Sequence, residues 1–169
     1  MNNTHEQVIE LYSKQLRLPT FNHYANVVRQ LGSDKSYEEF LLALMKMELD
    51  SRMESSQKRK IKSSNFPYIK TMDELDCNQF EHLSEAFIYE LASCDFVSKR
   101  QNVVTIGNPG TGKTHLSIAL GVKACMQGMN VKFYTAANLS NELIEAQEYK
   151  KLMKIEKQLS KIDLLVMMS

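Results

Sequence analysis

The chain has 169 residues, of which 43% are hydrophobic and 24% charged, and its 21 basic and 20 acidic side chains give a net charge of +1. This balance excludes a chain disordered by excess charge and a protein that nucleic acid attracts through its overall charge. No apolar run is long enough to cross a membrane, and the first residues lack a signal-peptide pattern. Cys77, Cys94 and Cys125 have no Cys-x-x-Cys spacing, so we expect reduced thiols in a cytoplasmic protein without a membrane partner.

Residues 1–97 are predicted to form an all-helical domain. Apolar residues recur at helical spacing in successive stretches, and residue types that cap helix N-termini precede them. Pro19 is expected to end the first helix and Gly32 the second, while the third is expected to run on into residues 52–62. The predicted caps, including one for a short turn at Thr71, are Thr4, Thr20, the Ser36–Glu39 capping box, the Thr71–Glu74 box and Asn78.

Two sets of basic residues stand out against the near-neutral total. Residues 52–70 hold six basic side chains and one acidic side chain, a local charge of +5, and a second set of lysines lies between residues 150 and 161. Both sets agree with a solvated helix face, and both agree with contacts to phosphates. The candidate nucleic-acid-binding residues are Arg52, Lys58, Arg59, Lys60 and Lys62.

Residues 98–169 are predicted to form part of an α/β domain. The β-branched run at 102–106 is typical of a buried parallel strand, and a helix follows as far as Gly128. Residues 131–135 alternate as a second strand, Asn138 is expected to open one long helix, and 162–167 form a third apolar strand. This alternation of strands and helices predicts a parallel sheet.

A phosphate-binding motif lies between the first of these strands and its helix. Residues 107–114 satisfy the pattern G-x-x-x-x-G-K-[ST] in full. Its glycines let backbone amides approach phosphate oxygens, and the following helix presents its positive N-terminus to the same anion. The lysine supplies a charge for the β- and γ-phosphates, and the last hydroxyl suits Mg²⁺. The predicted nucleotide site comprises Gly107, Asn108, Pro109, Gly110, Thr111, Gly112, Lys113 and Thr114, with the adjoining His115.

Hydrolysis requires more than this loop. The metal ion needs a carboxylate at the end of a neighbouring strand, and the attacking water needs an orienting group. Asp163 begins the strand at 162–167, and Met168 and Ser169 stand where acids are expected. We therefore assign no catalytic residue and expect the chain to stop inside the domain.

Several segments resemble the IstB-like ATP-binding proteins, the AAA+ helper ATPases of bacterial insertion sequences, which are similar to the helicase loader DnaC. The sequences that carry the resemblance are GNPGTGKTHL at 107–116, FYTAANL at 133–139 and DLLV at 163–166. In the helical half, LRLP at 16–19 and the Phe66-Pro67 element with Lys70-Thr71 fit the family's N-terminal region.

The resemblance implies an AAA+ P-loop NTPase sheet, incomplete in this chain, behind a helical domain. In the strand order of that family, the strand at 102–106 would lack its neighbours here unless it pairs with residues 163–167. It implies ATP and Mg²⁺ as cofactors, with Lys113 as the Walker A lysine and Thr114 as the magnesium ligand. It also implies homo-oligomers on DNA and a transposase partner, so that the function is that of a transposition helper with impaired hydrolysis. Two alternatives stay open: a non-enzymatic remnant that binds DNA or a transposase, and a DnaC-like helicase loader.

Overall fold

In a computed structural model of the chain, the structure describes residues 3–32, 35–76, 80 and 83–169. The chain divides into two compact units, Met1–Ser56 and Gln57–Ser169. This division falls within the longest helix, and residues 57–98 belong to the second compact unit. The predicted boundary between residues 97 and 98 concerns domains that fold independently, and it stays a prediction.

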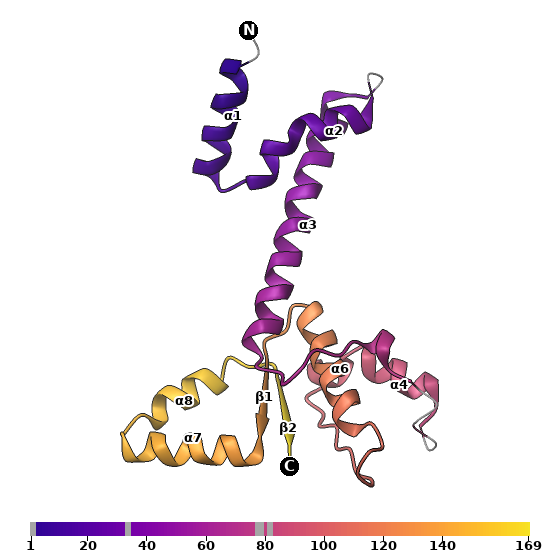
Figure 1. Cartoon of the computed structure of the whole chain (residues 1–169), viewed down its shortest axis with the longest axis vertical. Coiled ribbons are helices and arrows are strands. Elements are labelled where there is room, and N and C mark those ends of the chain that lie inside the picture. The colour runs from indigo at the N-terminus through magenta and orange to yellow at the C-terminus, as the bar shows by residue number, and fades with distance from the viewer. Residues whose placement is uncertain (1–2, 33–34, 77–79, 81–82) are drawn as a thin grey trace. The chain divides into compact units, whose positions relative to one another are not determined.

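The first unit is helical, as predicted for this part of the chain. Its longest helix begins at the predicted capping box, where the Glu39 N–H donates to Ser36 Oγ at 3.2 Å and the Ser36 N–H donates to the Glu39 carboxylate at 3.0 Å. Figure 1 shows this helix without interruption. The elements are α1 (Asn3–Leu16), the 3-10 helix η1 (Pro19–His23), α2 (Tyr24–Leu31) and the first part of α3 (Tyr37–Ser63).

The prediction that Thr20 caps the second helix is wrong. Thr20 lies within η1, and its N–H and its hydroxyl both donate to the carboxylate of Glu48 on α3. Arg52 Nε donates to the other oxygen of the same carboxylate at 2.6 Å, and Arg52 Nη2 donates to the carbonyl of Arg17 at 2.5 Å. Glu48 is buried, and a buried carboxylate requires such donors, so Thr20 is used for this tertiary contact.

The second unit combines helices with a small sheet (Figure 1). The Thr71–Glu74 capping box is present, whereas the predicted cap at Asn78 lies outside the described residues, and Ser84 caps the helix that follows. No described helix is long and apolar enough to cross a membrane. The elements after α3 are η2 (Met72–Glu74), α4 (Glu85–Ala92), α5 (Asp95–Ser98), α6 (Lys113–Met126), β1 (Val131–Thr135), α7 (Ala136–Glu148), α8 (Leu152–Leu159) and β2 (Leu164–Met168).

The strands predicted at 131–135 and 162–167 are confirmed as β1 and β2. They pair in parallel, with Val131 opposite Leu164 and Thr135 opposite Met168. Asp163 lies just before β2, and its carboxylate accepts a hydrogen bond of 2.7 Å from the Asn130 N–H just before β1. This bond joins the two residues that precede the strands and so fixes the sheet at the end where both strands begin.

The strand predicted at 102–106 is wrong. These residues belong to no strand, and no hydrogen bond joins their backbone to another described residue. Val104 is 77% exposed and Ile106 is 91% exposed. A parallel strand exists only beside a neighbour, and β2, which we considered as that neighbour, pairs with β1.

The single helix predicted after the second strand is also wrong. Helix α7 begins at Ala136, and its cap is Thr135, whose hydroxyl accepts from the Asn138 N–H at 3.1 Å. The helical path breaks between α7 and α8, where Lys150 has a left-handed φ of 54°. Neither glycine nor proline marks this break in the sequence, and a lysine there gives no signal of left-handed backbone.

Helix α6 forms the centre of the second unit. One group of its buried side chains packs with Val131 and Val166 of the sheet, and another packs with Ile88 and Ala92 of α4. Gly121 of α6 lets Phe66 and Val166 approach the helix backbone closely. The buried residues of α6 are Leu116, Ile118, Ala119, Leu120, Gly121, Val122, Ala124 and Cys125.

The cysteines that the structure describes are free thiols, in agreement with the prediction. Cys94 and Cys125 are both buried, and burial raises the pKa of each thiol above its ordinary value. Cys77 lies outside the described residues.

Gly121→Ala is expected to destabilise the second unit. A Cβ there would lie 2.7 Å from the Phe66 ring and 3.2 Å from a Val166 methyl, and overpacking of this kind costs about 1–3 kcal/mol. The direction of the stability change tests the packing, because Gly→Ala within a helix otherwise stabilises a protein by roughly 1 kcal/mol. Urea unfolding followed by circular dichroism measures the change. Ser117→Ala on the same helix is the control, and a more stable Gly121→Ala protein would contradict the packing.

Glu48→Gln is expected to destabilise the first unit at neutral pH. Burial opposes the charge of Glu48, but hydrogen bonds from Thr20 and Arg52 outweigh burial and hold its pKa below the usual 4.5. A lowered pKa means that the contribution to stability is complete above about pH 4.5 and is lost as the pH falls through the folded-state pKa.

The loss at pH 7 should be about 1–3 kcal/mol, as for hydrogen bonds to a charged group. Urea unfolding at pH 7 and at pH 3.5 measures the free energy of unfolding in each condition. The natural chain should lose stability between pH 7 and pH 3.5, and the Glu48→Gln variant should lose less. Glu10→Gln, which alters an exposed pair with Lys14, should change little. Equal effects of the two substitutions would contradict the role of Glu48.

Candidate functional site

The predicted phosphate loop leads into the N-terminus of α6. Gly112 is the residue before the helix and has φ 78° and ψ 2°, and Gly110 has φ 81°. Side chains disfavour this left-handed region, so glycine suits these turns. The first amides of α6 have no carbonyl partner within the helix, and the helix dipole makes this end positive. The loop and the helix therefore place anion-binding groups together.

The Lys113 side chain folds back into this loop. Its Nζ donates to the carbonyl of Gly107 at 2.8 Å, to the carbonyl of Asn108 at 2.6 Å and to Thr111 Oγ1 at 3.3 Å. The Thr111 hydroxyl in turn donates to the Asn108 carbonyl at 2.9 Å. The ammonium group thus lies inside the loop, where carbonyl oxygens hold it.

Thr114 is the second residue of α6 and is half-buried at the base of the loop. Its hydroxyl is an oxygen donor of the type that Mg²⁺ accepts. Within the part of the chain that the structure describes, no group of three or more His, Cys, Asp or Glu residues could hold a metal ion. A protein-only metal site is therefore not formed by these residues.

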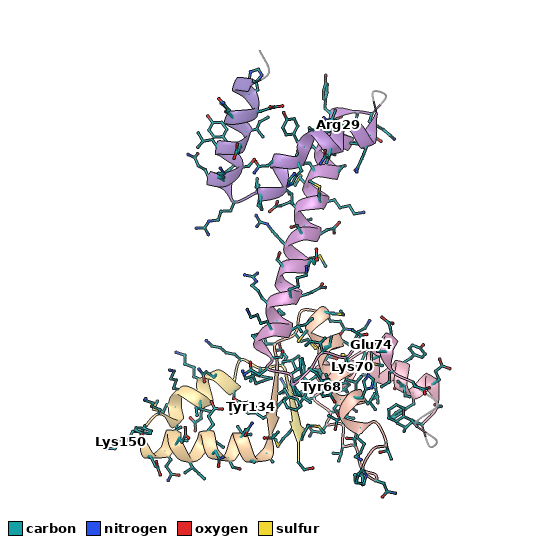
Figure 2. The ribbon with its side chains drawn as sticks, viewed as in Figure 1. Arg29, Tyr68, Lys70, Glu74, Tyr134 and Lys150 are labelled. Atoms are coloured by element: carbon teal, nitrogen blue, oxygen red, sulfur yellow. The ribbon has the colours of Figure 1, made fainter. Side chains whose placement is uncertain are left out.

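His115 lies on the side of α6 that packs against η2. Its Nε2 atom is buried and has no hydrogen-bond partner. The Thr71 N–H, followed by the charges of Lys70 and His115, lowers the pKa of Glu74 in η2, and Figure 2 labels Lys70 and Glu74 in this region. His115 therefore lies near this turn.

A cavity of about 1080 Å³ adjoins the loop. Ligand pockets commonly have volumes of about 300–1,000 Å³. Gly107, Thr111 and Lys113 form part of its lining, together with the segment 101–106. The sequence analysis missed this cavity because it depends on tertiary packing, although the helical spacing of the apolar residues in α4 was visible. The apolar wall is formed by Phe80, Leu83, Phe87, Leu91, Phe96 and Leu116.

The candidate nucleic-acid-binding residues all lie on α3 but do not share one face. At 100° per residue, Arg52 and Arg59 lie on one side of the helix, Lys58 and Lys62 on another, and Lys60 on a third. Some of these side chains have partners within the chain, since Arg52 binds Glu48 and Lys60 Nζ donates to Asn130 Oδ1 at 2.7 Å. The predicted set is therefore a basic segment of helix whose members point in different directions.

The family described as IstB-like ATP binding protein matches residues 12–169. An ATP-binding protein of insertion sequence IS5376 from Geobacillus stearothermophilus is 34% identical over 148 residues, which cover 86% of this chain and 59% of that protein. An ATP-binding protein of insertion sequence IS21 from Pseudomonas aeruginosa is 29% identical over 94% of this chain and 61% of its own length.

A third relative, from insertion sequence IS232 of Bacillus thuringiensis subsp. berliner, is 28% identical over 85% of this chain and 58% of its own length. The chain thus spans about three fifths of the length of these relatives. Because the family match includes nearly the whole chain and the complete phosphate loop, the chain belongs to the family of IstB-like ATP-binding proteins.

Proposed function

We propose that the chain binds ATP together with Mg²⁺ at residues 107–114. The observation that carries this proposal is the complete phosphate-loop motif at the N-terminus of the buried helix α6, with the Lys113 ammonium group inside the loop. Membership of an ATP-binding family supports ATP as the ligand. The site would bind the triphosphate through charge and backbone amides.

Each group has a role that follows from its chemistry. The amides at the start of α6 and the Lys113 ammonium group bind the phosphate oxygens. On binding, phosphate replaces the loop carbonyls as the partner of Lys113 Nζ. Magnesium keeps several waters and takes one or two protein ligands besides phosphates, so the Thr114 hydroxyl fits this requirement. His115 supports the loop through its packing against η2.

The cavity beside the loop has room for the nucleoside part of ATP. It shares Gly107, Asn108, Thr111 and Lys113 with the phosphate site. Its other wall is rich in phenylalanine and leucine side chains, which suit the flat apolar faces of a base. One ligand can therefore occupy the loop and the cavity together.

The activity proposed for the described residues is nucleotide binding. Asp163 is held by Asn130 where the strands begin, and parallel α/β sheets bind ligands at the ends where strands finish. Met168 and Ser169 at that end of β2 supply no carboxylate. No residue described here is assigned the role of activating water.

We further propose that the chain is a helper in DNA transposition and acts with DNA and a transposase in a homo-oligomer. The support is that the relatives are named as ATP-binding proteins of insertion sequences. The basic segment of α3 supplies positive charge for DNA phosphates. A DnaC-like helicase loader and a non-enzymatic remnant are the alternatives, and a pull-down of the partner protein distinguishes the transposase from a helicase.

Lys113→Ala is expected to weaken ATP binding about 10–100-fold, because charge-assisted hydrogen bonds contribute about 1.5–3 kcal/mol. Isothermal titration calorimetry with ATP and Mg²⁺ measures the dissociation constant. Lys123→Ala removes a lysine from the same helix away from the loop and should bind as the natural chain does. If the natural chain binds no ATP at millimolar concentration, or if Lys113→Ala binds equally well, the nucleotide site is elsewhere or absent.

Substitution of both Lys58 and Lys62 by alanine is expected to weaken DNA binding equally for all sequences. If both lysines contact phosphates, the slope of log K against log salt should become shallower by about 2. Fluorescence anisotropy with a labelled duplex at several salt concentrations measures this slope. The matched control replaces Lys154 and Lys157 on α8. A loss confined to that control pair would move the DNA site away from α3.

A further inference from the structure

A second cavity of the second unit lies away from the phosphate loop. It has a volume of about 570 Å³ and is lined by residues of β1, α7, α8 and the end of α3. Among the described residues, none lines both this cavity and the larger one beside the loop. Figure 1 shows α7 and α8 on one side of the strands and α6 on the other. A cavity of this volume admits a small molecule.

Two lysines supply positive charge to this cavity. Lys132 and Tyr134 are two residues apart on β1, so their side chains lie on the same face of the sheet. Lys132 is half-buried and its Nζ donates to the Ser63 carbonyl at 3.2 Å, while Lys161 lines the cavity from the turn before β2. No described carboxylate forms an ion pair with either lysine. An ammonium group has three N–H donors, so Lys132 keeps donors for an anion.

Glu142 on α7 supplies the opposite charge. Burial, followed by a hydrogen bond to Glu142, raises the pKa of Tyr134 above its ordinary value, so the phenol is protonated at neutral pH and donates to the carboxylate. A carboxylate accepts several hydrogen bonds, and no described basic side chain forms an ion pair with Glu142. The cavity therefore offers an acceptor for a cation as well as donors for an anion.

The structure holds these opposite charges apart within one small space. Ser63 binds Lys132 and Tyr134 binds Glu142, so each charged group has a partner of its own. Lys132 Nζ lies 5.9 Å from the centroid of the Tyr134 ring, which brings both charged groups within reach of one small molecule. A ligand that fits this cavity carries both charges and an aliphatic group, because part of the wall is formed by Val131, Ile155, Leu159 and Ile162.

We propose that this cavity binds a free α-amino acid with an aliphatic side chain. The α-carboxylate binds the ammonium groups of Lys132 and Lys161, and the α-ammonium group binds Glu142. The aliphatic side chain packs against Ile155 and Leu159. Charge-assisted hydrogen bonds are the stronger ones, so both ends of the zwitterion contribute to the affinity, whereas a purely anionic ligand would be repelled by the glutamate. The site is independent of the phosphate loop and is tested without nucleotide.

Isothermal titration calorimetry of the full chain with L-leucine is the first experiment, and one leucine should bind per chain. N-acetyl-L-leucine lacks the ammonium charge and L-leucinamide lacks the carboxylate, so each should bind at least about tenfold more weakly. Glycine lacks the aliphatic side chain and should also bind about tenfold more weakly. A natural chain that binds no leucine at millimolar concentration, or that binds N-acetyl-L-leucine equally well, would overturn the proposal.

Glu142→Gln tests the contact with the α-ammonium group. It should weaken leucine binding about tenfold and leave N-acetyl-L-leucine unaffected, because this analogue has no ammonium charge for residue 142 to bind. Glu145→Gln, one turn further along α7, is the matched control and should change neither affinity. Circular dichroism verifies that both variants fold. Equal losses of leucine binding in the two variants would contradict the site.

Lys132→Gln tests the contact with the α-carboxylate. It should weaken leucine binding about tenfold and leave L-leucinamide unaffected, because leucinamide has no carboxylate. Lys161→Gln is the second variant in case Lys132→Gln folds poorly, and Lys157→Gln on α8 is the control outside the cavity. Leucine affinity that is unchanged in both Lys132→Gln and Lys161→Gln, or lost only in Lys157→Gln, would place the amino acid elsewhere and overturn the proposal.

Discussion

The packing of α6 is the constraint on which the second unit depends. Its buried residues occur on several sides of the helix, as expected for a helix enclosed by other elements. The sheet contacts one side through Val166, α4 contacts another through Ile88, and Phe66 approaches the backbone at Gly121. A helix fixed from several directions cannot rotate without disrupting each contact. The N-terminus of α6, and with it the phosphate loop, is therefore held in one orientation.

The end of α3 is fixed to this same core through Ser64. Its carbonyl accepts a hydrogen bond of 2.8 Å from the Phe133 N–H in β1, and its buried hydroxyl donates to the Lys60 carbonyl and lies 3.2 Å from Cys125 Sγ on α6. One small buried residue thus joins a helix end, a strand and the central helix. The basic segment of α3 ends at this junction, which explains why Lys60 has a structural partner in Asn130.

Local patterns predicted those elements that local forces determine. The Ser36 capping box, the strands at 131–135 and 162–167 and the glycine-rich loop before Lys113 depend on neighbouring residues, and the structure contains them. The errors share a different cause. Thr20 is used by Glu48, which is 28 residues away in sequence, and the run at 102–106 has strand propensity but no strand beside it. The cavity likewise needs α4 and the loop to meet in space, which no sequence spacing reveals.

The unpaired segment before the loop gives Lys113 a second role. No strand holds residues 102–106, so regular structure fixes the loop only on its α6 side. The bonds from Lys113 Nζ to the carbonyls of Gly107 and Asn108 join the beginning of the loop to its end. The same ammonium group must exchange these carbonyls for phosphate oxygens when a nucleotide binds. Affinity therefore depends on the difference between the two sets of bonds, and an interaction that orders residues 102–106 would strengthen nucleotide binding by freeing Lys113 from holding the loop closed.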